Sequence, residues 1–127
     1  MYLHNFNQYL TEKVTSIHGL QSIIFSDYSG TVMYKVSKVE ICRSIYLSIT
    51  NFIDSLIPLS KCLAGDACNS FIIYLNDMQV VHLPLDKFLI TLVASEDGNT
   101  GYMVNFVRHM PTVYLDLLLA AKDSCYV

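Results

Sequence analysis

Apolar residues near the start of the chain recur with the spacing of an amphipathic helix. Steps of three or four residues separate the positions Leu3, Phe6, Leu10, Val14 and Ile17, which places them on one helical face. Gly19 follows this stripe at a position where helices commonly end. The pattern therefore predicts an amphipathic first helix.

Two runs rich in β-branched and aromatic residues come next, Leu20 to Ser26 and Thr31 to Val36. The four residues between them, Asp27-Tyr28-Ser29-Gly30, include the glycine that a tight turn favours. This part of the chain is expected to form a β-hairpin.

The segment from Glu40 to Leu63 predicts a second helix with a wide apolar arc. Two neighbouring stripes make up the arc: Ile45, Ile49, Phe52, Leu56 and Leu59 in one, and Tyr46, Ile53 and Ile57 in the other. They span roughly 160° of the helix, more than the roughly 100° that one core-facing stripe occupies. We expect this helix to face both a core and a partner. Pro58 removes a helical hydrogen bond, so the helix is expected to bend or stop near Ile57.

Three further strands and a last helix complete the pattern. The expected strands are Phe71 to Leu75, Met78 to Leu83 and Phe88 to Ala94, the first two joined by a tight turn at Asn76-Asp77. Helical spacing then links Met103, Phe106, Val107, Met110, Val113, Tyr114, Leu117 and Leu118. Asn99 or Thr100 suits the N-cap of this helix, and Pro111 is expected to kink it or to start another.

The element order is therefore αββαβββα in a single domain over residues 1–127. The predicted fold class is α/β, with a single-layer, five-stranded antiparallel sheet and helices on its faces. Apolar residues make up 53% of the chain and charged residues 15%, against averages of roughly 45–50% and about 25%. One small core cannot hide this surplus, which favours an obligate oligomer.

Charge and sequence motifs exclude several classes of function. The net charge of −3, without a cluster of Lys and Arg, argues against nucleic acid as a partner. No apolar run reaches the roughly 18 residues of a membrane span, and neither a signal peptide nor a lipidation motif is recognisable. We therefore expect a cytoplasmic protein without direct membrane insertion.

The side chains that commonly carry chemistry do not form a motif. Histidines and cysteines are scattered at His4, His18, His82, His109, Cys42, Cys62, Cys68 and Cys125, without metal-ligand spacing or a Cys-x-x-Cys pair. The adjacent acids Glu96 and Asp97 are typical of a loop before a helix. His82 interrupts an apolar strand and is expected at a sheet edge or a contact. We predict no catalytic residue, metal site or cofactor, and hence no enzyme.

Several segments resemble the roadblock/dynein-light-chain family, in particular the MEK-partner scaffold subunits of Ragulator (LAMTOR) complexes. The resemblance is carried, in order, by the segment from Gly19 to Gly30, Lys35-Val36, Gln79-Val80-Val81, Leu92-Val93-Ala94-Ser95 and Asn99-Thr100-Gly101. It covers most of the chain except Ser37 to Asn69, which is more apolar than the family pattern and contains Pro58.

This resemblance implies a roadblock, profilin-like fold and a non-catalytic scaffold or adaptor that forms a heterodimer with a second roadblock-type subunit. It further implies a larger Ragulator-like complex with a lipidated anchor subunit at the cytosolic face of late endosomes or lysosomes. There it would support Rag GTPase–TOR signalling and MEK–ERK kinase signalling.

The wide apolar arc and the adjacent edge strand together suggest the surface used for pairing. We expect the partner interface to comprise Tyr46, Ile49, Ile53, Ile57, Ser70, Ile72 and Tyr74. Two alternatives stay open at this point. One is another roadblock module, a dynein light chain or a self-pairing regulator of a small GTPase; the other is a small hydrolase or ligand-binding domain, which requires a closed pocket with convergent polar groups.

Overall fold

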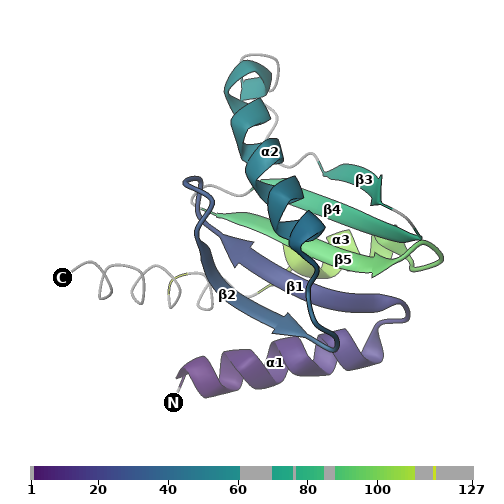
Figure 1. The fold of residues 1–127 in the computed structure, drawn as a ribbon. Coiled ribbons are helices and arrows are strands. Elements are labelled where there is room, and N and C mark those ends of the chain that lie inside the picture. Colours follow the sequence, from purple (N-terminus) through teal and green to yellow (C-terminus); the bar gives the residue numbers. More distant parts are fainter. Residues whose placement is uncertain (1, 61–69, 76, 85–87, 111–115, 117–127) are drawn as a thin grey trace.

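The computed structural model describes residues 2–60, 70–75, 77–84, 88–110 and 116, with the side chains of 2–4 and 56–60 left aside. Its elements follow the predicted order (Figure 1). They are α1 (Tyr2–Ser16), β1 (Leu20–Ser26), β2 (Val32–Ser37), α2 (Arg43–Ser60), β3 (Phe71–Leu75), β4 (Met78–Pro84), β5 (Leu89–Ser95) and α3 (Thr100–Arg108). The prediction of an αββαβββα fold is confirmed.

The five strands form one antiparallel sheet in the order β2-β1-β5-β4-β3. β2 and β3 are therefore its two edges, and β1 and β5, far apart in sequence, pair at its centre. In Figure 1, α2 crosses one face of the sheet, whereas α1 and α3 lie on the other. The inner strands are thus covered on both sides, which explains why they are mostly apolar and why polar residues on them, such as Gln79, His82 and Thr91, are buried.

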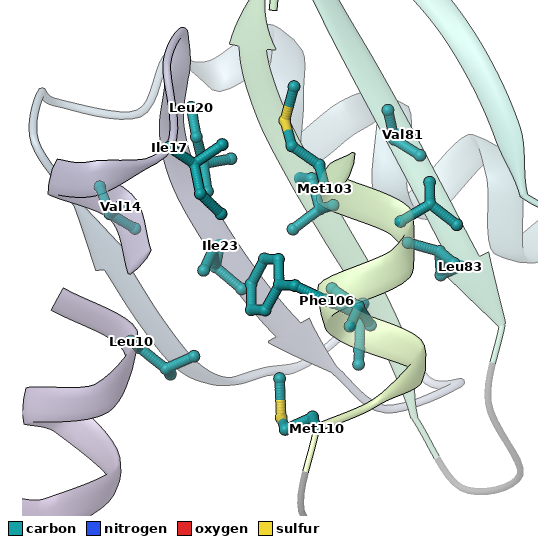
Figure 2. Close-up of a cluster of buried hydrophobic side chains, with 14 of the residues drawn as sticks. Leu10, Val14, Ile17, Leu20, Ile23, Val81, Leu83, Met103, Phe106 and Met110 are labelled. Carbon is teal, nitrogen blue, oxygen red and sulfur yellow. The ribbon is translucent and has the colours of Figure 1, made fainter. Parts of the chain in front are cut away.

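The larger part of the core lies between the sheet and the pair α1 and α3. Figure 2 shows α1 and α3 directing apolar side chains toward the strands. Of the stripe predicted for the first helix, Phe6, Leu10, Val14 and, just after α1, Ile17 are buried here, each at most 5% exposed, whereas the side chain of Leu3 lies outside the described ones. From α3 come Met103, Val104, Phe106 and Val107. Apolar residues spaced i, i+3/i+4 along the chain therefore form one packed face of each helix.

A second, smaller core lies under α2. It contains Ile45, Ile49 and Phe52 of the helix, packed with Ile24, Val80, Leu89 and Val93 of the strands. The alternation along β5 divides the two cores, because Leu89 and Val93 point to α2 whereas Ile90 and Leu92 point to α1 and α3.

The β1–β2 turn is fixed by one carboxylate. Asp27 Oδ1 accepts hydrogen bonds from the backbone N–H of Ser29 and of Thr31, both at 3.0 Å, and from the Ser29 hydroxyl at 2.5 Å. Gly30 adopts a φ of +93°, the left-handed region that glycine enters without a steric cost. The turn predicted at Asp27-Tyr28-Ser29-Gly30 is confirmed.

The start of α3 is tied to the sheet through Gln79 of β4. Its Nε2 donates to the carbonyl oxygens of Ser95, at 2.9 Å, and Gly98, at 3.0 Å, and its Oε1 accepts from the Thr100 hydroxyl. Gln79 is buried, so these bonds satisfy an amide that water does not reach. Asn99 is the N-cap, and its Oδ1 accepts from the backbone N–H of Tyr102 at 3.0 Å.

Three of the predictions concern Pro58, Pro111 and the turn at Asn76-Asp77. The prediction was that α2 bends or stops near Ile57; the helix does not stop there but continues to Ser60 and includes Pro58, and the bend stays a prediction. Pro58 lies near the end of α2, where it removes one hydrogen bond while the three preceding turns already hold the helix on the sheet. Pro111 and Asn76 lie outside the described residues.

Candidate partner interface

The β3 edge of the sheet carries exposed apolar side chains. β3 is bonded on one side to β4, and no described strand lies on its other side. Phe71 and Leu75 turn inward and pack on the core beneath α2. Ile72 and Tyr74 point to the opposite face and remain 43% and 65% exposed. The strand therefore offers both free backbone groups and apolar surface, the combination through which sheet edges join another chain.

The opposite edge, β2, is protected. Its pairing with β1 is interrupted by a bulge between Phe25 and Ser26, which disturbs the regular ladder. Lys35 lies in the middle of the strand, and its Nζ donates to the Tyr46 hydroxyl at 2.9 Å. Bulges and lysines are devices by which edge strands avoid association. Of the two edges, β3 is thus the one suited to pairing.

The two flanks of α2 differ in chemistry and in direction. Tyr46 reaches Lys35 of β2, and Thr50 lies beside Gly30 in the β1–β2 turn, so this flank faces the β2 side. Ser48 contacts His82 of β4, so the other flank faces β3. The β3-facing flank also carries Asn51 and Ser55, which are three or seven residues from Ser48 and are exposed. The flank that faces the free edge is therefore polar.

The seven residues predicted for the interface occupy three different places. Ser70, Ile72 and Tyr74 are at or beside the β3 edge and are accessible. Ile49 is 1% exposed and belongs to the core under α2, so the chain by itself does not present it. Tyr46 and Ile53, seven residues apart, share the flank that faces β2. The side chain of Ile57 lies outside the described residues.

The expectation that His82 lies at a sheet edge or a contact is wrong. β4 lies between β5 and β3, and α2 covers this face, so the imidazole is fully buried. Nδ1 lies 2.9 Å from the Thr91 Oγ1 and Nε2 lies 3.2 Å from the Ser48 Oγ. Burial lowers the pKa of His82 from 6.5 to about 4. Both ring nitrogens are thus engaged by hydroxyls, which suits a structural residue better than a base waiting for a substrate.

The acids Asp97 and Glu96 lie in the loop before α3, and Asp97 makes polar contacts there. Asp97 accepts from the Ser95 hydroxyl at 2.5 Å and lies 3.4 Å from His18 Nε2. The Ser95 and His18 hydrogen bonds hold the pKa of Asp97 below its usual value. Glu96, the other acid predicted to be a loop residue, is exposed beside it. Both acids lie in the turn that leads to Asn99, as expected.

Within the part of the chain that the structure describes, His, Cys, Asp and Glu side chains form no group of three that could hold a metal ion. Every buried side-chain nitrogen or oxygen atom of the described residues has a hydrogen-bond partner. Cys42 is exposed and free, whereas Cys62, Cys68 and Cys125 fall outside the described residues. None of the described helices is long and apolar enough to cross a membrane.

Sequence reasoning did not find the junction of Ser48, Phe52, Phe71 and His82 beneath α2. The signal was present in part, since a histidine stood in an otherwise apolar strand. Its partners come from elements 34 residues earlier and 9 residues later along the chain, and only the sheet order brings them together.

The chain is similar to a known family over most of its length. A family model described as "Mitogen-activated protein kinase kinase 1 interacting" matches residues 4–118. The Ragulator complex protein LAMTOR3 of Rattus norvegicus is 27% identical over 124 residues, which cover 92% of this chain and 95% of that protein. LAMTOR3-A of Xenopus laevis is 26% identical over 117 residues, covering 87% and 90%.

Solved structures share the fold at lower sequence identity. A roadblock/LC7 domain from Streptomyces avermitilis superposes with a TM-score of 0.60 at 10% identity, covering 94% of this chain and 97% of that one. The structure described as MglB with tetrameric arrangement gives a TM-score of 0.59 at 14% identity and covers 76% of each chain. The five-stranded antiparallel sheet and its helices are therefore those of the roadblock/LC7 fold.

Proposed function

The chain belongs to the mitogen-activated protein kinase kinase 1 interacting family, and from this premise we propose that it is a scaffold subunit of a Ragulator-like complex. Its relatives in Rattus norvegicus and Xenopus laevis are named Ragulator complex proteins and match it almost end to end. In this role the chain is not an enzyme: it holds other proteins in place, and the surfaces of the fold matter more than any pocket.

Pairing with a second roadblock-type subunit is the central part of the proposal, and the unprotected β3 edge is the observation that carries it. The partner's edge strand joins β3 so that the sheet continues from one subunit into the other. Ile72 and Tyr74 then gain cross-strand neighbours, which contribute roughly 0.2–1 kcal/mol per pair. The proposed surface therefore comprises Ser70, Ile72 and Tyr74 together with the α2 flank that faces β3.

The α2 part of this surface differs from the one expected from the apolar arc. A subunit joined to β3 meets the flank with Ser48, Asn51 and Ser55 rather than the flank with Tyr46 and Ile53. A polar contact of this kind favours a partner that supplies matching hydrogen-bond groups, because unpaired polar groups are costly to bury. This supports a heterodimer over indiscriminate self-pairing.

The wider assembly follows from the family. We place the subunit pair in a complex with a lipidated anchor, at the cytosolic face of late endosomes or lysosomes. There it would serve Rag GTPase–TOR signalling and MEK–ERK signalling. Attachment through partners agrees with a chain whose described helices are not suited to crossing a membrane.

Co-expression with each roadblock-type subunit encoded in the same genome, followed by native mass spectrometry, tests the pairing. We expect a one-to-one heterodimer. Replacing Tyr74 with Lys should weaken it severalfold while the chain stays folded, because the side chain is already 65% exposed in the unpaired chain. Tyr102→Lys is the matched control, since Tyr102 is a tyrosine of similar exposure, 53%, on α3, which is not part of the proposed surface.

Two results would contradict the proposal. One is a wild-type chain that remains a monomer with every roadblock-type subunit tested. The other is a Tyr74→Lys variant that pairs as well as Tyr102→Lys does. A homodimer formed by the chain alone would instead favour the self-pairing alternative.

A further inference from the structure

The buried imidazole of His82 connects three elements of the fold. Its Nδ1 meets Thr91 of the neighbouring strand β5 at 2.9 Å, and its Nε2 meets Ser48 of α2 at 3.2 Å. His82 itself belongs to β4 and is fully buried. The Ser48–His82 hydrogen bond therefore joins a side chain of α2 to an inner strand and fastens the helix to the middle of the sheet.

Aromatic contacts extend this junction to the edge strand. The ring of Phe52 in α2 stacks on His82, with centroids 4.6 Å apart and planes inclined by 16°. The same Phe52 lies 5.1 Å from the ring of Phe71 in β3, and Phe71 is the direct cross-strand neighbour of His82. The imidazole therefore contacts both elements of the proposed pairing surface from the buried side, α2 through Ser48 and Phe52 and β3 through its cross-strand neighbour Phe71.

We propose that His82 is a positioning residue that holds α2 against β3, so that the pairing surface keeps its shape only while the imidazole is neutral. This inference rests on the proposed function, since it assigns to His82 the relative placement of the two elements that receive the partner. The anchoring of α2 by His82 is a property of the unpaired chain and can be tested without the partner.

The surroundings of the ring favour the neutral form. The groups that face it are uncharged: Ser48 and Phe52 from α2, Phe71 from β3, Thr91 from β5 and Ile24 from the same core on β1. Each hydroxyl can donate to a bare ring nitrogen or accept from a protonated one, so a neutral imidazole is fully satisfied.

A proton added to this ring places a charge in an apolar core without a counter-ion. The nearest acid on α2, Asp54, is exposed, as is Arg43 at the start of the helix. Burial accordingly lowers the pKa of His82 to about 4. Acidification is therefore expected to loosen α2 before it unfolds the sheet.

Four single variants separate anchoring of α2 from general stability. His82→Phe keeps a stacking ring but loses both hydrogen bonds, and His82→Gln keeps a donor and an acceptor. Ser48→Ala removes only the bond to α2. Thr91→Val removes only the bond within the sheet and is the matched control for Ser48→Ala, because each loses one hydroxyl contact to the same ring.

Amide hydrogen exchange of the unpaired chain is the first measurement. Faster exchange, by roughly tenfold for the loss of about one net hydrogen bond, is expected in α2 and β3 for His82→Phe and Ser48→Ala. Thr91→Val and His82→Gln should leave α2 near its wild-type protection. In the wild type, α2 should lose protection between about pH 6 and pH 4 after correction for intrinsic rates, and His82→Gln should not. Equal exchange in α2 for Ser48→Ala and Thr91→Val would overturn the proposal.

Affinity for the co-expressed roadblock-type subunit is the second measurement. His82→Phe should weaken pairing by roughly tenfold, and Thr91→Val by much less. Ser48→Ala is left out of this measurement, because Ser48 is also part of the proposed pairing surface. Unchanged affinity of His82→Phe would overturn the link to pairing even if α2 is loosened. If no subunit pairs with the wild type, the proposed function fails, and the exchange data still decide whether His82 anchors α2.

Discussion

Replacing Gln79 with Leu tests whether the loop before α3 is held by a single buried amide. The substitution places an apolar side chain of similar volume in β4 and removes the amide donor and acceptor. Gln79 makes three hydrogen bonds, to the carbonyl oxygens of Ser95 and Gly98 and with the hydroxyl of Thr100. All three partners belong to the segment between β5 and the first turn of α3.

The magnitude follows from these three contacts. At about 1 kcal/mol of net stability for each hydrogen bond, the variant loses roughly 3 kcal/mol. The Ser95 carbonyl keeps a second bond, from the backbone N–H of Gly98 at 3.0 Å, which limits the penalty of an orphaned acceptor there. Against a total of roughly 5–15 kcal/mol for a domain, the loss is large but leaves a folded protein.

Urea unfolding at neutral pH measures the loss as a lower midpoint with an unchanged m value. Gln8→Leu, at an exposed position of α1, is the control and should change stability by less than about 0.5 kcal/mol. A Gln79→Leu variant as stable as the control would refute the reasoning. So would a large loss with a changed m value, because that result points to a different compactness rather than to three missing bonds.

Three further predictions concern pH, backbone conformation and capping. Because the pKa of His82 is lowered to about 4, the folded state binds fewer protons than the unfolded state between about pH 4 and pH 6.5. The free energy of unfolding therefore has its full value above about pH 6.5 and falls by roughly 3 kcal/mol toward pH 4. Urea midpoints across this range should show that slope for the wild type and lack it for His82→Gln. Gly19→Ala should destabilise by more than Gly30→Ala: both have positive φ, but a Cβ at Gly19 comes within 2.9 Å of the Gly98 Cα, whereas at Gly30 the nearest atom is 3.8 Å away. Similar thermal midpoints for the two variants would contradict this contrast. Asn99→Ala removes the N-cap of α3 and should cost about 1 kcal/mol in urea unfolding, mostly regained in Asn99→Ser.

Local patterns predicted most of the secondary structure because each element is specified by a few neighbouring residues. The strand β1 was expected at Leu20 to Ser26 and β3 at Phe71 to Leu75, and both have those bounds. β-branched and aromatic runs bounded by turn residues carry that information within a short window. The end of α2 was predicted less well, because the helix continues through Pro58 to Ser60.

The proposed pairing surface agrees only in part with the one predicted from the sequence. The exposed β3 residues were anticipated, but the side toward which the α2 arc faces was not. The helical period places Tyr46 and Ile53 on one flank of α2, but it does not indicate which strand that flank contacts. The Lys35–Tyr46 and Ser48–His82 contacts decide this, and each joins residues from separate elements.

By itself the sequence determined the element order, the Asp27–Gly30 turn, the buried stripe of the first helix and a surplus of apolar residues. These properties follow from periodicity, turn chemistry and composition, which are local or additive. Tertiary structure alone decided that β1 pairs with β5, that β2 forms the edge opposite β3, and that His82 lies beneath α2. The physical reason is that strand order and helix orientation depend on contacts between distant segments, and those contacts are chosen by the packing of the whole chain.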